Sequence, residues 1–168
     1  FGRTLTWEGD ATAPDSGYGL RGFWTAVRST GQIVHLGMAH ASFTTYGDQA
    51  RLRARPNADL TAVRLVDTGT LDDVERQSTT GAEFMWISDD LKLEAEFMQS
   101  TVRRGASHRD FTGRGGYVSG VWNLTGESWG YRNGVPVTPK AKQPRQGLWQ
   151  AGVRYDWIDL DDGNVLPA

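Results

Sequence analysis

The chain has 168 residues, enough for one domain with its own core, and it is rich in glycine (21) and tryptophan (7). The net charge of −2 argues against a nucleic-acid binder, and the absence of cysteine excludes disulfides and thiolate metal sites. Mean hydropathy is −0.50, and no run approaches the ~18 apolar residues of a transmembrane helix. Transmembrane strands remain possible, because half of their residues face away from lipid.

The first half of the chain predicts strands and turns. A short strand is expected over residues 3–7, a turn-rich stretch over 8–18 and a second strand over 19–28. After a tight turn at 29–31, residues 33–46 predict a long strand with small side chains on one face and apolar ones on the other. Residues 47–59 are polar and arginine-rich, and residues 67–79 are expected to be turn-like.

The second half continues this pattern. Residues 81–87 and 91–99 predict a hairpin, 100–115 a basic loop, 116–125 a strand, 127–145 a long loop and 146–160 a final strand. The predicted fold class is therefore all-β: an antiparallel up-and-down meander of seven or eight strands. Short turns are expected on one side and long loops on the other, as in porins.

The last strand has two unlike faces. One carries Trp149, Ala151, Val153, Tyr155 and Trp157, and the other carries Gln150, Gly152, Arg154 and Asp156. The two tryptophans would lie ~26 Å apart along a strand. At a tilt of roughly 40° this is ~20 Å of height, close to the apolar band of an outer-membrane barrel. The alternation alone fits a soluble strand equally well.

A family resemblance starts at residue 115. The marks are an aromatic-rich strand running into Leu124-Thr125-Gly126-Glu127, then Tyr131, and a returning strand that ends in YDWIDL (155–160). Upstream, IVHLG (33–37) and RLRARP (51–56) are less distinctive. Together these segments resemble the phosphate-selective porin O/P family, and the resemblance spans most of the chain.

This resemblance implies a transmembrane barrel of about 16 strands, usually a homotrimer, in the bacterial outer membrane. The expected partners are outer-membrane lipid and small anions, phosphate or polyphosphate in the best-known members, and not nucleic acid. Residues 1–168 would form a single segment of the porin domain, roughly half of the barrel. We expect both ends to be cuts within a longer protein, and the chain lacks the aromatic terminal residue typical of porins.

Arginines and lysines are the candidate anion-binding residues. In an extended RLRARP, one face carries Arg51, Arg53 and Arg55 at ~6.6 Å steps, resembling the family's ladder of channel-lining arginines. Two loops would add a basic rim: Arg103 and Arg104 with Arg109 and Arg114, and Lys140 and Lys142 with Arg132 and Arg145. The alternative for all of them is ordinary solvated charge, which is favoured for the two loops.

The remaining candidates belong to the barrel wall. The polar faces of clean strands carry Glu94, Glu96, Arg154 and Asp156, which would face the lumen and pair across strands. Trp149, Tyr155 and Trp157 would form a lipid-facing girdle, and Glu127 is expected to be structural.

Catalysis has little support, and no cofactor or metal is expected. His35 and His40 should face opposite sides of one strand, and no catalytic or phosphate-loop motif is present. Two alternatives stay open. One is a soluble β-barrel or sandwich that binds a ligand of carbohydrate type, and the other is a structural barrel that anchors an envelope partner.

Overall fold

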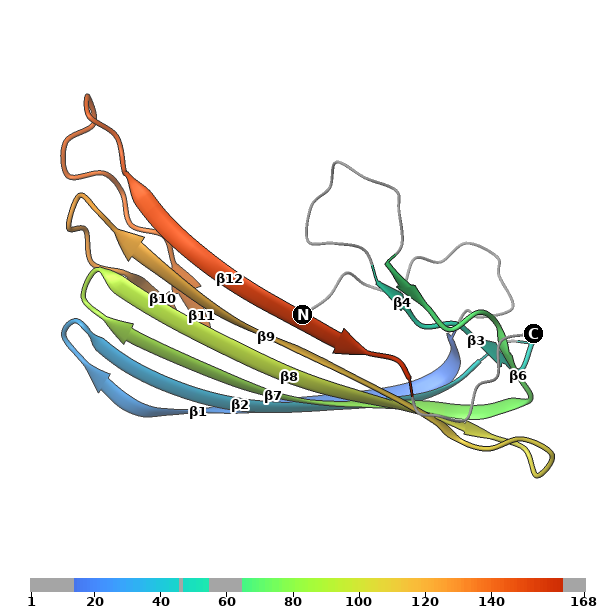
Figure 1. The fold of residues 1–168 in the computed structure, drawn as a ribbon. Helices are drawn as coiled ribbons and strands as arrows, with labels where there is room; N and C mark the ends of the chain where they lie inside the picture. Colours follow the sequence, from blue (N-terminus) through green and yellow to red (C-terminus); the bar gives the residue numbers. More distant parts are fainter. Residues whose placement is uncertain (1–13, 46, 55–64, 162–168) are drawn as a thin grey trace.

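The computed structural model describes residues 14–45, 47–54 and 65–161, in which all regular structure is β and no helix occurs. Six long strands form one antiparallel sheet in the order β1-β2-β7-β8-β9-β12. They bend together into a curved sheet (Figure 1). Their bounds are β1 Pro14–Ser29, β2 Gln32–Thr45, β7 Val74–Ser88, β8 Leu91–Arg104, β9 Phe111–Asn123 and β12 Gln150–Asp159. The predicted all-β meander is confirmed.

Three small two-stranded sheets lie in the connections between the long strands. β3 (Gln49–Ala50) pairs with β6 (Leu71–Asp72), and β4 (Arg53–Ala54) pairs with β5 (Val66–Asp67). β10 (Gly130–Arg132) and β11 (Val135–Val137) form a hairpin. Asn133 and Gly134 in its turn both have positive φ, 52° and 81°. An Asn-Gly pair suits such a two-residue turn because both residues tolerate that conformation.

The connections differ from the expected arrangement. Tight turns join β1 to β2 and β7 to β8 at one end of the strands, but the long segment 124–149 leaves β9 at the same end. The opposite end holds the long connection 46–73 and the short loop 105–110. Each end therefore has one long connection, and the prediction of short turns at one end only was wrong.

Two predicted loops also proved too long. Residues 74–79 belong to β7, and residues 100–104 and 111–115 belong to β8 and β9, so the basic loop shrinks to 105–110. In 74–79 and 100–104 polar side chains occupy both faces of the strand, and in 111–115 the inner face carries only Phe111 and two glycines. The apolar alternation that indicates a strand is absent there, although the backbone pairing continues.

The buried apolar residues form two separate clusters. One lies at the end of the strands where connection 46–73 is, and it contains Ala50, Leu71, Val74, Val102 and Phe111. The other contains Ile33, Met85 and Ile87, against which Trp129 and Tyr131 of segment 124–149 pack. Both long connections thus fold against the same face of the sheet, which we call the inner face. The opposite one is the outer face.

Candidate functional site

The outer face is apolar and uncovered. On β12, Val153 is 76% exposed, Tyr155 69% and Trp157 40%, and Trp149 just before the strand is 65% exposed. The strand register continues this face across the sheet. In a soluble sandwich a second sheet would cover these side chains, and none does so among the described strands. The exposed members on the other strands include Trp24, Leu36, Met38, Phe84, Phe97 and Val118.

The inner face carries a polar belt between the two apolar clusters. The register aligns His35, Glu94 and Arg154 in one row, and Glu83, Glu96, Tyr117 and Asp156 in the next. Arg21 and Lys92 reach this region from neighbouring rows. We call these nine residues the inner-face belt. Glu94, Glu96, Arg154 and Asp156, the expected lumen-facing set, lie together on it.

Glu83 links three strands in the belt. Its Oε1 accepts a hydrogen bond from Arg21 Nη2 at 2.5 Å and lies 3.1 Å from Nε2 of His35, which is 1% exposed. Arg21 is on β1 and Glu83 on β7, so the ion pair crosses the intervening strand β2. A Cβ on Gly37 would lie 2.1 Å from that carboxylate oxygen. The small residues on the inner side of β2 therefore leave space for the Arg21–Glu83 ion pair to pass over this strand.

Two further ion pairs of the belt each lie along a single strand. Lys92 Nζ donates to Glu94 Oε2 at 2.6 Å, and Arg154 Nε donates to Asp156 Oδ1 at 2.8 Å. These two ion pairs differ from the cross-strand pairing expected from the sequence, because residues two apart on a strand share a face and long side chains can bridge them. The Arg154 guanidinium also lies 3.6 Å from the centre of the Tyr117 ring.

Segment 124–149 folds onto the belt. The Tyr131 hydroxyl lies 2.7 Å from His35 Nδ1 and 3.0 Å from Thr25 Oγ1. Trp129 lies under Lys92, whose Nζ is 4.5 Å from the ring centre. The hairpin turn approaches β1 so closely that a Cβ on Gly134 would be 3.1 Å from the Phe23 ring. The segment thus covers part of the inner face.

The Leu-Thr-Gly-Glu motif joins the beginning of segment 124–149 to Lys142 near its end. Glu127 is 3% exposed and accepts hydrogen bonds from the Thr125 hydroxyl and, at 2.8 Å, from the backbone N–H of Lys142. These bonds hold the pKa of Glu127 below its usual value. Lys142 Nζ donates to the Gly126 carbonyl at 2.5 Å. Glu127 is therefore structural, as expected, and Lys142 helps to close the segment.

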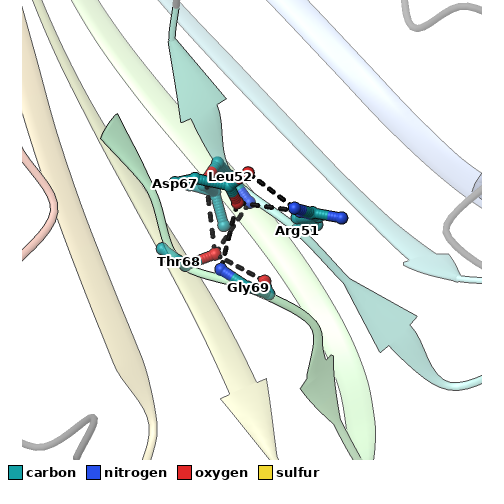
Figure 2. Close-up of polar contacts among 5 residues, drawn as sticks. All are labelled: Arg51, Leu52, Asp67, Thr68 and Gly69. Atoms are coloured by element: carbon teal, nitrogen blue, oxygen red, sulfur yellow. Dashed lines mark hydrogen bonds and ion pairs between the residues drawn. The ribbon is translucent and has the colours of Figure 1, made fainter. Parts of the chain in front are cut away.

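Arg51 is paired within its own connection (Figure 2). Its Nε and Nη2 donate to the two carboxylate oxygens of Asp67 at 2.8 and 2.6 Å. The Arg51 hydrogen bond is the main reason that the pKa of Asp67 is lowered to about 2, and the Gly69 N–H adds to it. A bidentate pair of this kind occupies the fork with which arginine would hold a phosphate.

The other candidate cations are spread over several elements. Arg53 is exposed on β4, and Arg55 lies outside the described residues. Arg104 is on the inner side of β8 and donates to the Asp72 carbonyl at 2.8 Å, whereas the register places Arg103 on the outer side. Lys140 is exposed in segment 124–149. Arg51 and Arg53 both lie close to Asp67, the first through its ion pair and the second through the pairing of β4 with β5. The three-arginine ladder stays a prediction.

Sequence reasoning missed four residues that meet at the inner face, three of the belt and Tyr131 of segment 124–149. Arg21, His35, Glu83 and Tyr131 meet from four elements that lie far apart in the chain, so no local pattern marks them. The run of small residues on one side of β2 was the available signal. Bulky or polar side chains from neighbouring strands must fill the space above it.

Among the described residues, no helix is long and apolar enough to cross a membrane. The same residues bring together no group of three or more histidine, cysteine, aspartate or glutamate side chains that could hold a metal ion.

An antiparallel sheet with an apolar uncovered face and a polar face onto which its own connections fold matches the pattern expected for part of the wall of an outer-membrane barrel. The family model "Phosphate-selective porin O and P" matches residues 6–167, and the chain belongs to this family of outer-membrane channels. It is 31% identical over 161 residues to an uncharacterized protein of Caulobacter vibrioides, covering 90% of this chain and 32% of that protein. It is 22% identical over 169 residues to Porin O of Pseudomonas aeruginosa, covering 89% of this chain and 39% of that protein. The chain thus spans about a third of the length of these curated relatives.

Proposed function

We propose that this chain forms part of a barrel through which small anions, phosphate or polyphosphate among them, diffuse across the bacterial outer membrane. The observation that carries the proposal is the division of one sheet into an apolar outer face and a charged inner face. In lipid the outer face would contact acyl chains, and the inner-face belt would contact water. Because β1 and β12 are each paired on one side only among the described strands, closure requires further strands. A trimer is part of the same proposal.

The anion preference would arise from the connections and not from the belt. The belt pairs most of its charges internally and has four acids (Glu83, Glu94, Glu96, Asp156) against three permanent cations (Arg21, Lys92, Arg154). Segment 124–149 carries Lys140, Lys142, Arg132 and Arg145, all exposed, and Arg53 and Arg104 lie in or beside the opposite connection. A rim of such charges raises the local concentration of anions.

Segment 124–149 would also set the width of the passage. It lies over the inner face and is fastened there by Tyr131 at one point and by Glu127 at its base. A solute would pass between this segment and the part of the barrel wall that faces it.

Single-channel recordings of the full-length protein in planar bilayers test the proposal. We expect a reversal potential that shows anion preference in a potassium chloride gradient, and a chloride current that falls as phosphate is added. Replacement of Lys140 and Arg145 by glutamine should weaken both effects. The matched control replaces Arg76 and Arg103, on the outer face of the sheet, by glutamine and loses the same charge. Cation preference, with a chloride current that phosphate does not inhibit, would refute the proposal.

A further inference from the structure

Two arginines face each other on the outer side of the sheet. Arg76 on β7 and Arg103 on β8 are directly paired in the register, next to the bulge at Glu75. Both are exposed, and neither has an ion-pair partner within residues 14–45, 47–54 and 65–161. Like charges directly opposite each other destabilise a sheet. An anion bound between the two guanidinium groups would relieve this repulsion.

A row of hydroxyl residues lies beside the arginine pair on one side. Arg76 Nη1 donates to Ser42 Oγ at 3.2 Å, and Ser42 shares a 2.8 Å hydrogen bond with Ser78. The register places Thr101 and Thr112 in the same row as these serines. The contact with Ser42, which is 2% exposed, holds the Arg76 guanidinium close to the surface of the sheet. Two arginine forks beside serine and threonine donors are suited to a phosphate group.

The pair lies next to the apolar outer face. Along β8, Phe97 is followed on the same side by Gln99, Thr101 and Arg103, so the face changes from apolar through polar to cationic. The distance from Phe97 to Arg103 is ~20 Å along the strand, or ~15 Å of height at a tilt of roughly 40°. Flexible arginine side chains can extend along the sheet, which brings their guanidinium groups closer to the apolar face and to the headgroup layer of a membrane.

A third arginine lies nearer to the apolar face. Arg114 on β9 is exposed and occupies the row beside Gln99, next to that of Phe97. It faces Asp159 on β12, with which it forms no ion pair; the Asp159 carboxylate instead accepts the backbone N–H of Asp161. Arg114 therefore adds to the positive charge close to the acyl chains, although less than an unopposed arginine would.

We propose that Arg76 and Arg103 form a binding site for the phosphorylated headgroup of a membrane lipid whose acyl chains lie on the outer face beside Phe97. Free phosphate shares the anionic group, but the continuity of the site with an uncovered apolar surface favours the lipid. The site is independent of the proposed anion passage, because it lies on the opposite face of the sheet from the inner-face belt.

The test compares the full-length protein with its Arg76→Gln/Arg103→Gln variant. Each is reconstituted with phosphatidylcholine and bisphosphorylated lipid A, or with lipid A from which both phosphates have been removed, and the lipid retained after detergent extraction is counted by native mass spectrometry. We expect the double variant to retain the phosphorylated lipid about tenfold less than the unchanged protein. The control variant Arg132→Gln/Arg145→Gln should retain it fully, and no protein should retain the dephosphorylated lipid.

Equal retention by the double variant, or equal retention of the dephosphorylated lipid, would overturn the proposal. Displacement of the lipid by excess inorganic phosphate would show that the site serves free phosphate, and would overturn it too. The double variant should fold, since it relieves repulsion between like charges, and the single variant Arg103→Gln gives a second reading. Its conductance should be unchanged; a fall in conductance with full lipid retention would instead place Arg103 in the passage.

Discussion

At the scale of single residues, charged side chains on the inner side of the sheet bind mainly to one another. Arg21 with Glu83, Lys92 with Glu94, and Arg51 with Asp67 are ion pairs at 2.5 to 2.6 Å. Arginine spacing in RLRARP predicted where cations occur, but not that Asp67, sixteen residues later, would bind the first of them. A side chain that is paired within the protein attracts a passing ion less strongly than an unpaired one, because its partner neutralises part of its charge.

Release of Arg51 is expected to strengthen the interaction with anions. In Asp67→Asn, Arg51 loses its bidentate partner and its fork becomes available to phosphate. Single-channel recordings should show phosphate inhibiting the chloride current at about fivefold lower concentration, equivalent to about 1 kcal/mol for a partly exposed pair. Asp72→Asn removes the same charge in the same connection, from a residue that accepts a hydrogen bond from Gln49. If both variants respond alike, net charge alone is responsible.

The Arg51–Asp67 pair should also resist acid. The folded-state pKa of Asp67 is about 2 and its ordinary value is 3.8, so the pair stabilises the connection fully above that ordinary value. The contribution is lost as pH falls through the folded value. Hydrogen exchange, corrected for its intrinsic pH dependence, should show the Leu52 and Gly69 amides equally protected at pH ~7 and pH ~5, and losing protection near pH ~2. Loss of protection already near pH ~4, around the ordinary value of an aspartate, would contradict the lowered pKa.

At the scale of the elements, sequence predicted strands wherever one face is apolar. The second arm of the 81–99 hairpin and β12 alternate clearly, and both were found. The stretch 74–79 was missed because polar side chains lie on both of its faces, and 111–115 because glycines interrupt its apolar face after Phe111. The inward fold of segment 124–149 was not predictable, since Trp129 and Tyr131 have no periodic neighbours and contact strands far away in the chain.

The Tyr131 hydroxyl is predicted to fasten segment 124–149 to the sheet. Tyr131→Phe keeps the ring and removes the contacts with His35 and Thr25, which costs about 1 kcal/mol and raises the undocked fraction of the segment roughly fivefold. Recordings should then show a noisier open-channel current. Tyr155→Phe, on the outer face, is the matched control and should not change the current. Identical traces for the two variants would mean that the hydroxyl does not hold the segment.

At the level of the whole molecule, the function depends on the orientation of one sheet. The outer face must contact lipid and the inner face must contact water, because a reversed sheet would place the inner-face belt in hydrocarbon. The proposed anion passage and the proposed lipid site both require this orientation. The residue patterns of β12 indicated it, and the exposure of Val153 and Tyr155 together with the inward fold of both long connections supports it.

Neighbouring residues of β12 allow the most direct measurement. The chain contains no cysteine, so Gly152→Cys on the inner face and Val153→Cys on the outer face each introduce one thiol into it. In the full-length protein, within native outer membranes, a charged water-soluble maleimide should label position 152 and leave position 153 unlabelled. A maleimide that partitions into lipid should label position 153. Labelling of position 153, and not of 152, by the water-soluble reagent would contradict the account.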